Sequence, residues 1–178
     1  MTMKRVDPVP EKATIPVPEL APVPNDLVAS LKFGPAADGE MPSVAGMRSA
    51  SDPWKVRGET AEESLHALSK LRPFIEVGRL QNDVVGYVTI ERDGPVPGAA
   101  YMRNIVVKPE FRRKGVGMKL LSHGLQVAKD LHRKTVALRV DPSNSVAVSF
   151  YRTAGFTTVA TVVSKKSGKL RLLMSKEL

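Results

Sequence analysis

The sequence predicts a mixed α/β domain, and three observations support this fold class. Of the 178 residues, 42% are hydrophobic, which is enough for one domain with a sizeable core. From about residue 59 onward, apolar residues repeat with a strand period in some segments and with a helix period in others. Glycine, proline and asparagine separate these segments. The order of the segments mixes helices and strands along one chain.

The first predicted elements are a helix and three strands. In order, we expect a helix at 59–71, a strand at 74–80, a turn at 81–83, a strand at 84–91, a Gly/Pro loop at 93–98 and a strand that ends at Val107. Upstream of these elements, the sequence allows a first strand at 27–33.

The strand that ends at Val107 leads through a glycine-bearing turn into a helix. Ile105 and Val106 are β-branched like Val107, and Pro109 stops further pairing. Apolar residues at helical spacing then predict a helix at 115–132. It is followed by a strand at 135–140, a helix at 145–153 and a hairpin of two strands at 156–164 and 169–174.

The first 58 residues differ in composition from the rest. They hold nine of the fourteen prolines, and Pro-Val-Pro recurs at 8–10, 16–18 and 22–24. Such a stretch favours extended polyproline II or disorder. We therefore predict a proline-rich arm or linker at 1–58 and a folded domain at 59–178. Acidic and basic residues cancel within the arm, so the net charge of +9 belongs to the domain.

Composition also excludes several kinds of site. Without cysteine, the chain has no disulfide, no zinc-thiolate site and no cysteine nucleophile. The three histidines have no metal-ligand partners nearby in sequence, so we expect no metal site. There is no apolar run of membrane-spanning length and no signal-peptide pattern. We expect a soluble, cytoplasmic protein without a membrane partner.

The turn before the helix at 115–132 is suited to binding an anion. The first N–H groups of a helix have no partner within the helix, and the helix dipole is positive there. Gly115 and Gly117 have no Cβ atoms to keep a phosphate away from this backbone. Arg112, Arg113 and Lys114 add positive charge. A simple turn with exposed basic residues fits the same residues, and neither the P-loop nor the dinucleotide fingerprint is present.

A second segment, Asn144-Ser-Val-Ala147-Val-Ser-Phe-Tyr151-Arg-Thr-Ala-Gly155-Phe156, strengthens the anion-site interpretation. Together the two motifs resemble those of the GNAT superfamily of acetyl-CoA-dependent N-acetyltransferases, from about Phe74 to Met174. The resemblance implies a mostly antiparallel sheet flanked by helices, with splayed central parallel strands and a C-terminal β-hairpin. It implies transfer of an acetyl group from acetyl-CoA to a primary amine of a small molecule or protein.

The resemblance also assigns roles to residues. The cofactor-binding residues would be Ile105, Val106, Val107, Arg112, Arg113, Lys114, Gly115, Val116, Gly117, Met118, Asn144, Ala147 and Tyr151. Tyr151 would also act as general acid toward the departing thiolate, because the pKa of a phenol lies above that of a thiol and the phenol keeps a proton to give. Structural alternatives stay open: Tyr151 as a residue packed on the sheet, Asn144 as a helix N-cap, and residues 105–107 as core strand residues.

No general base is assigned. Relatives that acetylate protein N-termini commonly carry a Glu five residues before the equivalent of Asn144, and here that residue is Arg139. Glu76 and Glu91 lie on or beside strands that could line an acceptor site, but either fits an ordinary surface carboxylate. A base acting through water is equally allowed. With one convincing helix between its first two strands, the acceptor region looks abbreviated.

Two other functions remain open. The chain could be an assembly-associated subunit whose arm at 1–58 anchors the module to a protein partner. The basic residues near the C-terminus (Lys165, Lys166, Lys169, Arg171 and Lys176) could instead contact nucleic acid. With only 5% aromatic residues and no nucleic-acid motif, a solvated basic face explains these residues better.

Overall fold

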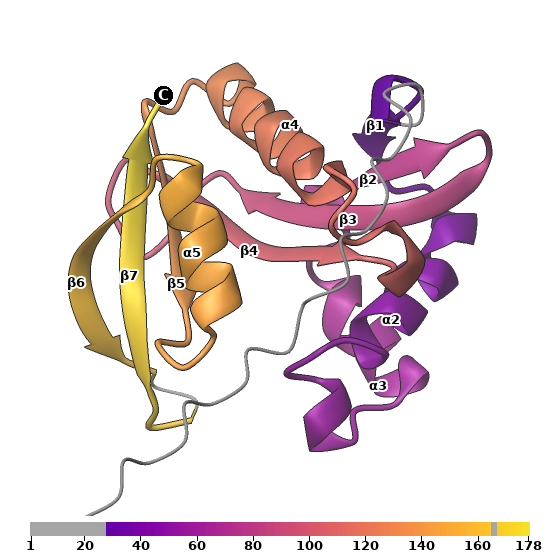
Figure 1. The fold of residues 1–178 in the computed structure, drawn as a ribbon, viewed down its shortest axis with the longest axis horizontal. Coiled ribbons are helices and arrows are strands. Elements are labelled where there is room, and N and C mark those ends of the chain that lie inside the picture. Colours follow the sequence, from indigo (N-terminus) through magenta and orange to yellow (C-terminus); the bar gives the residue numbers. More distant parts are fainter. Residues whose placement is uncertain (1–27, 165–166) are drawn as a thin grey trace, which may run out of the picture.

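The computed structural model describes residues 28–164 and 167–178, which fold around one seven-stranded sheet (Figure 1). The strands are β1 (Lys32–Pro35), β2 (Ile75–Leu80), β3 (Asp83–Glu91), β4 (Ala100–Val107), β5 (Thr135–Val140), β6 (Thr157–Val163) and β7 (Leu170–Glu177). The main helices are α2 (Met41–Ser49), α3 (Ala61–Ser69), α4 (Val116–Asp130) and α5 (Ser145–Thr153). The predicted mixed α/β fold class is confirmed.

The strand order is β1-β2-β3-β4-β5-β7-β6, and every neighbouring pair is antiparallel except β4 and β5. β4 and β5 are parallel because α4 carries the chain from one end of the sheet back to the other (Figure 1). β6 and β7 form the hairpin predicted near the C-terminus. The sheet therefore has the splayed central pair and the C-terminal hairpin that the resemblance implies.

Helices cover the two faces of the sheet with separate hydrophobic clusters. On one face, buried residues of α4 and α5 pack on β3, β4, β5 and β7, among them Leu120, Leu121 and Tyr151. On the other face, α2 and α3 pack on β2 and β3 through residues such as Val44 and Leu68. The second cluster covers only part of its face, since its strand residues come from β2, β3 and the end of β4.

The folded domain begins earlier than residue 59. β1 pairs with β2, from Lys32 opposite Arg79 to Pro35 opposite Glu76. α2 buries Met41, Val44 and Met47 in the core, and its proline lies in the first turn, where a missing N–H does no harm. The prediction of an extended arm is therefore wrong for residues 32–57. The three Pro-Val-Pro repeats lie outside the described residues.

The other boundaries agree with the prediction or differ from it by a few residues. α3 begins at Ala61 because Thr60 caps it: the Thr60 hydroxyl accepts from Glu63 N at 3.1 Å, and Glu63 Oε2 accepts from Thr60 N at 2.8 Å. α4 ends at Asp130, and β7 extends to Glu177. Because α2 and α3 both lie between β1 and β2, the region expected to be abbreviated holds two helices.

Two further features of the described residues concern membranes and metals. None of their helices has both the length and the apolar character that a membrane crossing requires. Within the same residues, His, Asp and Glu side chains form no cluster of three suited to a metal ion.

Candidate active site

The centre of the sheet holds a fork between β4 and β5. These strands pair at three positions only, and the last pair is Met102 with Leu138. Beyond it, β4 continues to Val107 with β3 as its one neighbour, whereas β5 continues alongside β7. A bulge marks the same place: one residue of β3, Thr89, lies opposite two residues of β4. The fork therefore exposes one edge of β4 over residues 103–107.

The backbone of β4 presents alternate residues to the fork. Lys108 N donates to Val85 O at 2.9 Å, and the carbonyl oxygen of Val106 lies against Gly86 of the same neighbouring strand. Since backbone groups alternate along a strand, those of Ile105 and Val107 point away from β3 and into the fork. Val106 differs from these two: its backbone faces β3 and its side chain is buried with α2 and α3.

The loop after β4 ends at an uncapped helix. Arg113 has a φ of 56° and Gly115, the N-cap residue of α4, a φ of 78°, so the loop turns sharply before α4 starts. No side chain caps this end of α4, and its first turn holds no acidic residue. The first amides of α4, which include those of Gly117 and Met118, are therefore available to an anion.

Arg112 is tied to the protein. Its Nε donates to Val107 O at 2.9 Å, and a terminal nitrogen donates to Ser51 Oγ at 3.1 Å. The side chain thus joins the loop, the end of β4 and the segment after α2. Arg113 is exposed and Lys114 is half-buried. The sequence indicated a positive loop, but it did not indicate that Arg112 braces it, because Ser51 lies 61 positions away.

Helix α5 begins beside the fork and contributes Asn144 and Tyr151. Asn144 is the N-cap of α5, and its Oδ1 accepts from Ala147 N at 3.0 Å. The N-cap interpretation of Asn144 is therefore confirmed, and its side-chain NH₂ group points to no acceptor among the described residues. Ala147 is half-buried against the core.

Tyr151 is buried on the inner side of α5. Its ring packs edge-on against Phe150 and Phe156, with centroid distances of 5.3 and 5.7 Å. Burial raises the pKa of the Tyr151 phenol to about 12. The structure is compatible with Tyr151 both as a residue packed on the sheet and as a catalytic residue. A ring packed on the sheet can still present its hydroxyl to a ligand in the fork.

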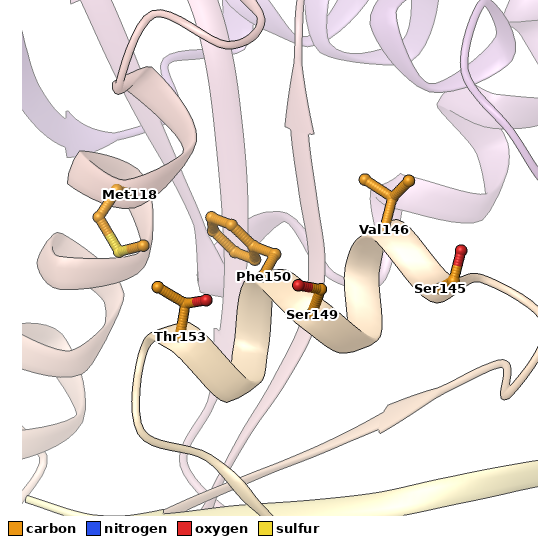
Figure 2. A pocket seen from close by; sticks show the side chains of 6 residues that line it. All are labelled: Met118, Ser145, Val146, Ser149, Phe150 and Thr153. Atoms are coloured by element: carbon orange, nitrogen blue, oxygen red, sulfur yellow. The ribbon is translucent and has the colours of Figure 1, made fainter. Parts of the chain in front are cut away.

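An open hollow of about 570 Å³ lies between α4 and α5 (Figure 2). Its lining comes from Met118 at the start of α4 and from one side of α5: Ser145, Val146, Ser149, Phe150 and Thr153. Val146 is 80% exposed and presents an apolar side chain to this hollow. The hollow lies next to the uncapped end of α4, because Met118 belongs to both.

The two candidate bases lie on opposite faces of the sheet. Glu76 points toward α4, where its Oε2 is 2.8 Å from His123 Nε2. Glu91 lies on the other face, where it forms an ion pair with Arg103. Arg139 is exposed on this second face. Neither carboxylate is free, so the structure adds no reason to assign one of them as a base.

The comparisons with known proteins agree with this fold. The model of the "Acetyltransferase (GNAT) family" matches residues 41–156. A curated relative, the chloroplastic GCN5-related N-acetyltransferase 4 of Arabidopsis thaliana, is 30% identical over 87 residues, which is 43% of this chain and 30% of the relative. The chain thus spans less than two thirds of the length of the curated relatives that it matches.

Solved structures resemble the chain over most of its length. Ard1 from Thermoplasma volcanium has a TM-score of 0.68 and 20% identity, with 84% of this chain and 98% of that one covered. Arabidopsis thaliana Naa50, solved in complex with the bisubstrate analogue CoA-Ac-MVNAL, has a TM-score of 0.61 and 18% identity over 84% and 99% of the two chains. At these identities, the likeness shows a shared fold.

Proposed function

The chain belongs to the acetyltransferase (GNAT) family, and on that premise we propose that it transfers an acetyl group from acetyl-CoA to a primary amine of a small molecule or protein. The observation that carries the proposal is the fork between β4 and β5 beside the uncapped end of α4. One part offers strand-like hydrogen bonds and the other offers amides for an anion. An acyl-CoA needs both, because its pantetheine arm is extended and amide-bearing and its pyrophosphate is anionic.

The residues present fit that group. The pyrophosphate would lie at the first turn of α4, with Arg113 and Lys114 supplying positive charge. The backbone of Ile105 and Val107 would bind the pantetheine arm, as would the free amide group of Asn144. The hollow between α4 and α5 offers apolar surface for the remaining part of the ligand. Arg112 would act by holding the loop in place rather than by direct contact alone.

When bound, acetyl-CoA supplies an activated thioester whose carbonyl carbon the amine attacks. The protein would orient this carbonyl by an N–H group of β4 at the fork, which favours negative charge on its oxygen. Tyr151 would present its hydroxyl to the sulfur atom from α5. The sheet face opposite α4 and α5 would admit the amine, because α2 and α3 leave it uncovered at Arg103 and Arg139. Holding the two reactants in this geometry contributes to the rate by proximity.

Isothermal titration with acetyl-CoA tests the anion site directly. We propose two variants of equal size, Gly117→Asp and Gly117→Asn. A Cβ atom at this position meets Phe150 and Val107 at 3.7 and 3.8 Å, which are ordinary contacts, so both variants should fold. Aspartate in the first turn also suits the helix dipole. Its charge would nevertheless repel a phosphate, and we expect acetyl-CoA to bind at least about tenfold more weakly to the Asp variant than to the Asn variant.

Acetyl transfer is then measured as release of the coenzyme A thiol with a panel of primary amines, and mass spectrometry of the products identifies the acetylated amine. Equal affinity of the Asp and Asn variants for acetyl-CoA would contradict an anion site at α4. Tight binding without transfer to any amine would support the cofactor site and refute the activity.

A further inference from the structure

Two arginines lie at the point where β4 and β5 separate. Met102 and Leu138 form the last pair, and the next residue on each strand is Arg103 and Arg139. Met102 and Leu138 are buried in the cluster under α4 and α5. Side chains alternate along a strand, so both arginines point to the opposite face. That face is open here, since both arginines are exposed.

Both guanidinium groups act on the same tyrosine, Tyr101. The guanidinium of Arg103 lies 5.0 Å from the ring centre of Tyr101, which is two residues earlier on the same strand. Burial raises the pKa of the Tyr101 phenol, and the positive charges of Arg103 and Arg139 both oppose this rise. Both charges therefore act on one phenol, whose residue lies one position before the last pair of β4 and β5.

Most of the positive charge on this face is balanced. Arg103 forms an ion pair with Glu91, and Arg171 forms one with Asp141 at 2.8 Å. Arg139 lies between them on β5, directly opposite Leu173 of β7. Among residues 28–164 and 167–178, no carboxylate lies within ion-pair distance of Arg139. One charge at the fork thus has no counter-charge in this part of the chain.

We propose that the acceptor of this chain is an amine that also carries a carboxylate, and that Arg139 binds this carboxylate while the amine faces the fork. The inference rests on the acetyl transfer proposed above and names the class of its acceptor. A guanidinium presents two parallel N–H groups that match a carboxylate. A single unbalanced guanidinium also matches the single negative charge of that group. A polycationic acceptor would instead be repelled by Arg103 and Arg139.

Two kinds of molecule carry this chemistry: a free amino acid and a peptide whose second residue is acidic. We therefore use two matched pairs of acceptors. Alanine is compared with alaninamide, and the amidated peptide Ala-Asp-Ala with amidated Ala-Asn-Ala. In each pair the amine is kept and one carboxylate is removed. The pair whose acid-to-neutral ratio depends on Arg139 identifies the source of the carboxylate.

The protein variants are Arg139→Gln and Arg139→Lys, and Lys134→Gln serves as the control. Lys134 is exposed and lies just before β5 begins, away from the fork. The Lys134→Gln variant therefore removes the same charge without changing the fork. The measured quantity is the ratio of kcat/KM for the acid to that for its matched neutral acceptor. Because each ratio is compared between variants, the different amine pKa values of the acceptors cancel.

In one pair, we expect Arg139→Gln to lower the acid-to-neutral ratio of the wild type about 10- to 150-fold, the range for a hydrogen bond to a charged group. Arg139→Lys should keep part of the preference, and Lys134→Gln all of it. A ratio that Arg139→Gln leaves unchanged in both pairs overturns the proposal.

A binding measurement separates this proposal from the proposed activity. In the presence of coenzyme A, we titrate the wild type and Arg139→Gln with the N-acetylated form of each of the four acceptors. Tighter binding of the acid in one pair that depends on Arg139 supports the carboxylate site even where turnover is absent. Equal binding of the acid and its neutral partner to the wild type in both pairs refutes it. Loss of coenzyme A binding itself would refute the proposed function instead.

Discussion

Replacing Tyr151 by Phe tests what its hydroxyl contributes to the reaction. Burial raises the pKa of this phenol to about 12, whereas an ordinary thiol has a pKa of about 8.5. Complete transfer of the proton to a thiolate is therefore unfavourable by roughly 3.5 pKa units, or about 5 kcal/mol. We therefore propose, beside the general acid that the sequence suggested, a second role for Tyr151: its hydroxyl donates a hydrogen bond to the sulfur and stabilises the thiolate without losing the proton.

The two views of Tyr151 predict different magnitudes. A hydrogen bond to a charged group contributes about 1.5 to 3 kcal/mol, so Tyr151→Phe should lower kcat about 10- to 150-fold. A general acid would contribute about 100- to 10,000-fold. The same hydrogen bond lowers the pKa of the bound coenzyme A thiol, and we expect this pKa to be about 1 to 2 units higher in the variant.

The pKa of bound coenzyme A is followed by the ultraviolet absorbance of its thiolate, which needs no acceptor amine. Turnover is measured with the best amine of the panel across pH 6 to 10, where a phenol with a pKa of about 12 stays protonated. Thermal unfolding serves as a control and should change little, because the ring contacts with Phe150 and Phe156 remain. An equal thiol pKa in both proteins, or an alkaline loss of activity below pH 10 that the variant lacks, would refute this reasoning.

Three further changes test other parts of the structure. Asn144→Ala should destabilise the protein by about 1 kcal/mol in thermal unfolding, whereas Asn144→Ser keeps a cap and should lose only acetyl-CoA affinity if the amide group binds the ligand. Gly115→Ala meets only Val28 at 3.6 Å but needs a left-handed backbone, so we expect a loss of about 1 to 2 kcal/mol in denaturant unfolding. Two hydrogen bonds from Arg79 lower the pKa of Glu40, so the charged carboxylate stabilises the folded state. We expect Glu40→Gln to lose about 1 kcal/mol of stability above pH 4.5, and the difference between the two proteins to disappear as the pH is lowered further in acid titrations.

The sequence predicted best the elements that follow one strong period. The strand at 135–140 and the helix at 145–153 have the predicted bounds, since β-branched residues and an Asn N-cap mark them locally. α2 was missed, and β1 was anticipated only by the strand allowed at 27–33, because both elements follow a stretch dense in proline. Only the buried spacing of Met41, Val44 and Met47 distinguishes α2 from such an arm, and three residues are a weak period.

The candidate site divides in the same way. Gly115, Gly117 and Asn144 lie in short motifs, so their place at helix starts could be predicted from neighbouring residues. The hydrogen bond from Arg112 to Ser51 joins residues far apart in sequence, and the register of β4 and β5 places Arg103 and Arg139 after the same last pair. Such contacts depend on strand register, which one sequence does not reveal. The sequence did draw attention to Arg139, because a Glu was expected at that position. A role for Arg139 could be proposed only once the structure placed Arg103 on the same face of the sheet.

The short pairing of β4 with β5 also affects how the protein unfolds. Three residue pairs are the whole ladder between the β1–β4 half of the sheet and the half formed by β5, β7 and β6. The sheet therefore has a seam with few backbone hydrogen bonds, and cooperative units tend to separate at such places. A ligand that lies along β4 as an extra strand would close this seam. Hydrogen exchange in β5 and β7 should then slow as the ligand concentration rises. The free energy that holds the two halves of the sheet together would thus depend on how much ligand is present.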